Sequence, residues 1–165
     1  MVEISALTIN ETDSVIYTVN DEKGKIYSLN DCEITGEYSF GKNGDYEGIE
    51  LVGDQLFVLK SNGKLIQYNL KLKSKVREIK NPLSQSNDTE GLGYDQATNC
   101  LLIACKASPN IKKKGKLKKT KAVYTYNIVE DSFSDKPFLT ISDANIQAYF
   151  DKAVSYTHLT LPTKA

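Results

Sequence analysis

The sequence has little of what most catalytic sites are built from. Its 165 residues include one histidine, no tryptophan and three cysteines. The histidine is His158, near the C-terminus, so the rest of the chain offers no Ser–His–Asp or Cys–His arrangement. Cys32, Cys100 and Cys105 are odd in number and include no CxxC pair, which argues against a disulfide framework and a zinc site. No GxGxxG loop and no complete GxxxxGK(S/T) motif occurs.

Charge and hydropathy exclude further classes of function. Basic and acidic side chains number 21 each, so the formal net charge is zero and no global field attracts nucleic acid. The lysine-rich segment Ile111–Lys121 has no aromatic residue on which a base could stack. The sequence favours a solvated loop there over contact with anionic lipid headgroups. No run of about 20 apolar residues is present, so no membrane-spanning segment is expected in this chain.

What the sequence does contain is an internal repeat. Asp45–Leu51 reads DYEGIEL and Asp88–Tyr94 reads DTEGLGY, so both carry Glu-Gly followed by an aliphatic residue. A weaker copy opens the chain at Glu3. The three glutamates, Glu3, Glu47 and Glu90, are 44 and 43 residues apart. Self-similarity at about 40–50 residues is typical of β-propeller blades, each made of four short strands.

Short β-branched and aromatic runs between turn residues support the same architecture. The fold class predicted is all-β: a partial β-propeller of about three four-stranded blades, with one short helix near the C-terminus. The blades are expected at residues 1–42, 43–85 and 86–142, the helix at 143–152, and the domain at 1–153. Beyond the repeated segments, strands are expected at Val15–Val19, Lys25–Leu29, Glu33–Phe40, Leu56–Leu59, Leu65–Leu70, Val76–Ile79, Leu101–Ala104, Ala122–Ile128 and Phe138–Ile141.

The last segment, residues 154–165 (VSYTHLTLPTKA), continues neither the blade repeat nor the predicted helix. It resembles translated sequencing-adapter read-through, so we interpret it as a non-native tail. The alternative is an ordinary disordered terminus. In either case Leu159 and Leu161 are expected to contribute little to the core.

The strings EISAL, NDEKGKIY, GKNGDYEGIELVGDQLFVLKSNGKL and NDTEGLGYDQATNCLLIACK resemble the SdiA-regulated (YjiK-like) β-propeller family, which is related to phytase-like propellers. The likeness covers about Val2 to Lys152, with Ala6 where the family commonly has glycine. It implies a five- or six-bladed parent that is extracytoplasmic, periplasmic or membrane-anchored, often as a lipoprotein of the cell envelope. It also implies bound calcium and a monomer when full-length. On this resemblance the chain is expected to be a fragment without its export signal.

The repeat predicts where a site would lie. The first strand of each propeller blade lines the central channel, so carboxylates at the same point of successive blades share one space. Glu3, Glu47 and Glu90 therefore form part of a predicted ring, with Asp45 and Asp88 two residues before the latter two. Oxygen ligands gathered from several loops suit calcium, so these five residues are the predicted metal ligands. The glycine after each glutamate is expected to let another backbone approach closely.

A structural alternative stays open at this point. The residues that end each second strand, aligned as Asn20, Lys60 and Lys106, complete a predicted ligand-binding set with Glu3, Glu47 and Glu90. Lys60 could equally pair with Glu47, and Lys106 with Glu90, as structural ion pairs. Three functions are therefore weighed. The first is an envelope module that binds calcium or a small ligand, the second a calcium-dependent phytase-like phosphoesterase, and the third a scaffold without a ligand.

Overall fold

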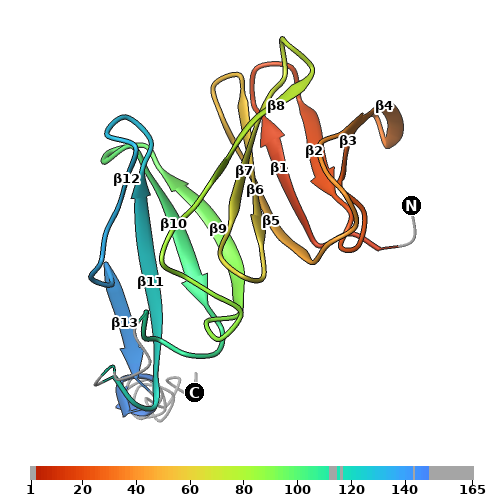
Figure 1. Ribbon diagram of the computed structural model, residues 1–165. Coiled ribbons are helices and arrows are strands. Elements are labelled where there is room, and N and C mark those ends of the chain that lie inside the picture. The colour runs from red at the N-terminus through yellow and green to blue at the C-terminus, as the bar shows by residue number, and fades with distance from the viewer. Residues whose placement is uncertain (1–2, 112–114, 116, 143, 149–165) are drawn as a thin grey trace, which may run out of the picture.

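The computed structural model describes residues 3–111, 115, 117–142 and 144–148, and Figure 1 shows their arrangement. These residues form three antiparallel sheets, which we call the first, second and third blades. The first blade holds β1 (Ala6–Asn10), β2 (Val15–Val19), β3 (Lys25–Asn30) and β4 (Glu33–Ser39). The second holds β5 (Tyr46–Val52), β6 (Gln55–Lys60), β7 (Leu65–Asn69) and β8 (Ser74–Ile79).

The third blade has an interrupted outer strand. It holds β9 (Thr89–Asp95), β10 (Cys100–Cys105) and β11 (Thr120–Asn127). Both β12 (Ser132–Phe133) and β13 (Leu139–Ser142) then pair with β11. Pro137 lies between the two short strands and has no N–H to donate to a ladder, which explains the break. The sequence predicted only the second of these pieces.

The blades pack face to face, with their first strands as neighbours. β5 contacts both β1 and β9, so the three innermost strands line one side of the arrangement (Figure 1). The middle blade is buried on both faces. Leu56 and Val58 pack in a core shared with the first blade, and Phe57 and Leu59 in one shared with the third. Alternate side chains of one strand therefore serve two cores. This is how successive propeller blades pack, and it confirms the all-β partial propeller.

Gly48 explains why glycine follows the motif glutamate. A Cβ at this position would lie 2.7 Å from Leu92 Cβ in the next blade and 3.2 Å from Leu59 Cβ. Real Cβ atoms essentially never approach another atom as closely as 2.7 Å, so only glycine lets β9 lie this close to β5. The predicted close approach is confirmed at Gly48. Gly91 is different, because its added Cβ would meet only Ala104 of its own sheet, at 3.0 Å.

Polar contacts also join neighbouring blades. Thr8 donates its hydroxyl to Glu50 across the first junction, at 3.4 Å. At the second junction, Arg77 of β8 donates to Asp131 Oδ2 at 2.6 Å and to the Tyr126 hydroxyl at 3.1 Å. Burial, followed by the hydrogen bond to Asp131, raises the pKa of Tyr126 to about 12. The phenol is therefore neutral and available to this bridge at any physiological pH.

The C-terminal region is described in part. Residues 144–148 are helical, within the predicted helix 143–152, whose other residues lie outside the described range. The tail 154–165, with Leu159 and Leu161, also lies outside it, so that prediction stands as a prediction. Within the described part of the chain, no helix is both long enough and apolar enough to cross a membrane.

Candidate functional site

The motif glutamates occupy β-bulges. In β5 the pairing with β6 passes from Tyr46 directly to Gly48, which leaves Glu47 as the extra residue. The same irregularity leaves Glu90 as the extra residue of β9. A bulge bends its strand and turns the extra side chain away from the regular alternation. The Glu-Gly motif is thus a bulged acid followed by a tightly packed glycine, at the start of an innermost strand.

Around Glu47 the structure assembles three carboxylates, which we call the acid cluster: Asp21, Asp45 and Glu47. One carboxylate oxygen of each lies within 4.8 Å of those of the other two. Asp21 follows β2, whereas Asp45 and Glu47 come from the start of β5. The backbone N–H of Tyr46 donates to the Asp21 carbonyl at 2.9 Å, and this bond holds the loop of the first blade against the second. The cluster therefore lies at a junction between two blades.

Glu47 is the electrostatically unusual member of the acid cluster. Its pKa is raised from 4.5 to about 7. The largest cause is burial, followed by a hydrogen bond with Asp45 and by the negative charges of Asp45, Asp21 and Glu90. Like carboxylates this close cannot all ionise without a compensating cation. In the absence of one, Glu47 is the group that retains a proton near neutral pH.

The equivalent acids of the third blade have a basic partner. Lys106 Nζ forms an ion pair with Glu90 and lies 3.9 Å from Asp88 Oδ2. The hydrogen bond to Glu90 is also the main reason that the pKa of Lys106 is raised. The ion pair predicted between Lys106 and Glu90 is thus present. The one predicted between Lys60 and Glu47 is absent from the described residues, because Lys60 lies over the Tyr46 ring instead, 5.1 Å from its centroid.

The strand register shows that the predicted alignment of Lys106 with Lys60 is wrong by one residue. The Ser61 N–H donates to the Asp45 carbonyl, and in the next blade the Lys106 N–H donates to the Asp88 carbonyl. Lys106 is therefore the structural equivalent of Ser61, one residue beyond that of Lys60. By the same register Asp21 is the first blade's member of this set. The same structural position is thus occupied by Asp21 in the first blade, Ser61 in the second and Lys106 in the third. The side chain at this position sets the local charge.

The register also corrects the placement of Glu3. Ala6 pairs with Val19 as Gly48 pairs with Leu59, so Ala6 and not Ile4 takes the place of the motif glycine. Glu3 then corresponds to Asp45, lies before β1 and is exposed. Its backbone carbonyl accepts a hydrogen bond from Asn20 Nδ2 at 2.7 Å. The buried Asn20 is thereby committed to holding the chain, since its Oδ1 also accepts from the Lys23 N–H.

A family model described as SdiA-regulated matches residues 1–149 of this sequence, which includes every strand described above. The chain belongs to the SdiA-regulated family. The earlier resemblance is thus confirmed. No curated protein matches the sequence.

Solved structures show the fold shared by this SdiA-regulated chain. Hydrazine synthase of Kuenenia stuttgartiensis is similar with a TM-score of 0.62 and 13% identity, over 85% of this chain and 38% of that one. U3-55K is similar with a TM-score of 0.56 and 12% identity, over 85% of this chain and 39% of that one. The computationally designed Ika4 protein is similar with a TM-score of 0.53 and 8% identity, over 79% of this chain and 69% of that one. The chain therefore spans well under half the length of the hydrazine synthase chain.

The acid cluster of this SdiA-regulated protein can be tested for fit to calcium. Calcium binds oxygen at about 2.3–2.6 Å, so two oxygens on one ion lie at most about 5 Å apart. The mutual separations within 4.8 Å meet that limit. Of the five predicted metal ligands, only Asp45 and Glu47 belong to the cluster. Asp88 and Glu90 are bound by Lys106, and Glu3 is separate. The sequence missed Asp21, whose only signal was its place in the turn that follows β2.

The raised pKa of Glu47 has a consequence for stability. The folded protein holds this proton up to about pH 7, whereas the unfolded chain releases it near 4.5. We therefore expect the contribution of Glu47 to stability to be greatest below about pH 4.5, to decline as pH rises towards 7, and then to level off. Thermal unfolding of calcium-free wild type and Glu47→Gln between about pH 5 and 8 measures this. The variant should lose less stability over that range, and parallel curves would contradict the assignment.

Proposed function

We propose that this protein is a calcium-binding module of the cell envelope, with its site at the acid cluster on the channel side of the first and second blades. The observation that carries the proposal is the convergence of Asp21, Asp45 and Glu47 without a basic side chain among them. In the third blade, the side chain of Lys106 lies beside the equivalent acids Asp88 and Glu90. A cation at the acid cluster would do what Lys106 does for Glu90.

Calcium is the cation whose chemistry suits these donors. It accepts oxygen ligands in flexible geometry, whereas magnesium requires near-octahedral geometry at shorter distances and keeps several waters. Three carboxylates leave positions for water or for an oxygen of a small ligand. Because few protein ligands are present, we expect a Kd on the order of 10⁻⁴–10⁻³ M, as in extracellular calcium modules. Such a site stays occupied outside the cytoplasm, which agrees with an envelope location.

The family resemblance supplies the rest of the proposal. It favours an extracytoplasmic or membrane-anchored protein, a ring of five or six blades, and a small ligand or an envelope component as partner. A calcium-dependent phytase-like phosphoesterase is the less favoured function. Neither of its two candidate phosphate-binding residues forms an ion pair with the acid cluster in the described part of the chain, because Lys106 is paired with Glu90 and Lys60 lies over the Tyr46 ring.

Calorimetric titration of the calcium-free protein tests this function. We expect one saturable calcium site and clearly weaker binding of magnesium, for the geometric reason given above. Binding at pH 7 should release protons, because the fraction of Glu47 that is protonated must ionise to act as a ligand. The heat should therefore depend on the ionisation enthalpy of the buffer. The absence of saturable heat at millimolar calcium would contradict the proposal, and phosphate-ester hydrolysis in its presence would favour the enzyme instead.

A further inference from the structure

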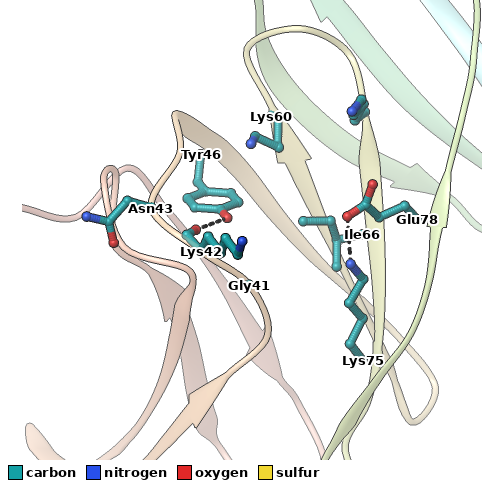
Figure 2. A pocket seen from close by; sticks show the side chains of 9 residues that line it. Gly41, Lys42, Asn43, Tyr46, Lys60, Ile66, Lys75 and Glu78 are labelled. Carbon is teal, nitrogen blue, oxygen red and sulfur yellow. Dashed lines mark hydrogen bonds and ion pairs between the residues drawn. The ribbon is translucent and has the colours of Figure 1, made fainter.

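A hollow lies beside the start of β5 in the second blade, close to the acid cluster but lined by other residues. Its volume is about 320 Å³, and it is enclosed by the β4–β5 connection, the end of β6 and the strands β7 and β8. Figure 2 shows this hollow with Tyr46 and Ile66 as its apolar walls. None of the three acid-cluster residues lines it. The hollow is therefore separate from the proposed calcium site.

The charge of this hollow is strongly one-sided. Four of its lining residues are lysines and one is acidic: Lys42, Lys60, Lys64, Lys75 and Glu78. Glu78 bonds to Lys75 at 2.6 Å, as Figure 2 shows, and its pKa is lowered mainly by that hydrogen bond. The other three lysines form no ion pair within the described part of the chain. Three lysines thus line the space without an ion-pair partner, although the charge of Glu78 also interacts with Lys60 and Lys64.

The lysine at the centre of the hollow is held in place. Lys60 Nζ lies 5.1 Å from the centroid of the Tyr46 ring, where the π-face of the ring attracts a cation. Gly44 makes room for it, because a Cβ at this position would lie 2.7 Å from Lys60 Nζ and 3.1 Å from Cε. The Tyr46 hydroxyl donates to the Lys42 carbonyl at 2.6 Å, which fixes the ring and the loop together. The ammonium group is therefore positioned before any ligand arrives.

We propose that this lysine-lined hollow binds a small multivalent oxyanion, of the phosphate or phosphate-monoester class. Lysine binds phosphate groups as a compact point charge with three donors, so several lysines around one space suit a multivalent oxyanion. The volume is within the range of small-molecule pockets and leaves space for an organic group against Tyr46 and Ile66. This site does not depend on the calcium proposal.

The test is a titration of the isotopically labelled protein followed by amide chemical shifts. Inorganic phosphate and glycerol 2-phosphate are the two probes, in a low-salt buffer because screening weakens exposed charges. Calcium is removed on a chelating resin, since soluble chelators are themselves polyanions. We expect saturable shifts at Asn43, Lys60 and Lys64 with both probes. Tighter binding of the monoester would identify an organic phosphate as the natural ligand, and equal binding would identify phosphate itself.

Variants of individual lysines decide whether the anion binds in the hollow or is attracted by the general charge of the surface. Lys60→Gln and Lys64→Gln should each weaken binding by at least about fivefold, since each removes one of three unpaired charges. Lys64 is exposed in the β6–β7 hairpin, so its variant remains informative if Lys60→Gln disturbs the fold. Lys71→Gln is the matched control, because Lys71 belongs to the same blade but lies outside the hollow and pairs with Asp54. No saturation by about 20 mM, an unchanged affinity in Lys64→Gln, or an equal loss in Lys71→Gln would overturn the proposal.

Discussion

Replacing Gly48 by alanine is expected to destabilise the protein by about 2 kcal/mol and to lower Tm by about 6 °C. The added methyl group would lie 2.7 Å from Leu92 Cβ, and both atoms are fixed to strand backbones. The two blades must therefore move apart, and their shared core loosens. Valine at the same position should be worse, because its branches extend further into the interface. Thermal and denaturant unfolding measure both variants.

Gly93→Ala is the matched control for that experiment. Gly93 lies in the neighbouring innermost strand, and no heavy atom lies within 4 Å of the position of its added Cβ. Its φ is not in the left-handed region, so alanine is not strained there. We expect a change within about 0.5 kcal/mol. Equal stability losses in Gly48→Ala and Gly93→Ala would mean that the close approach of β5 and β9 is not what requires the motif glycine.

Glu47→Gln is expected to abolish calcium binding in the range where wild type saturates, whereas Glu90→Gln should leave it nearly unchanged. The two residues hold the same bulge position in successive blades, so the pair of variants separates charge from backbone geometry. Glu47 belongs to the acid cluster, and glutamine keeps its shape but loses the charge that attracts a cation. Glu90 is already neutralised by Lys106. Calorimetry of both variants gives the result.

The opposite result would reassign the site. If Glu90→Gln lost calcium while Glu47→Gln retained it, the cation would have to displace Lys106, and the third blade would hold the site. Equal effects would support the ring of glutamates that the repeat spacing suggested. Unfolding temperatures of both variants serve as the control, because Glu90→Gln also breaks an ion pair. That pair is exposed, so its loss should affect stability little.

The fold was largely predictable because a blade repeat leaves a local signal. Strand runs such as Val15–Val19 recur between turn residues, and hydrophobic side chains on both faces of Leu56–Leu59 indicate a strand buried on both sides. The interruption between β12 and β13 was missed. Pairing to one edge of β11 is a tertiary property, and two residues such as Ser132–Phe133 are too short for a periodic signal.

The site was predictable only in part, because spacing does not fix register. The motif glycine aligned Glu47 with Glu90 correctly, but Gly48 pairs with Leu59 and Gly91 with Ala104, so Lys106 corresponds to Ser61 and not to Lys60. Asp21 entered the acid cluster through a bond between blades, Tyr46 N–H to the Asp21 carbonyl, which no pattern along the chain reveals. The sequence therefore predicted where the strands begin and end. Which charged side chains lie together depends on the contacts between blades, which the sequence pattern does not reveal.

Crystals soaked in calcium or in a lanthanide that replaces it test the central claim most directly. Anomalous diffraction locates the ion without reliance on stability or heat. We expect one strong peak within about 2.6 Å of oxygens from Asp21, Asp45 and Glu47. A peak at Asp88 and Glu90 instead, or no peak at the acid cluster at millimolar ion, would contradict it.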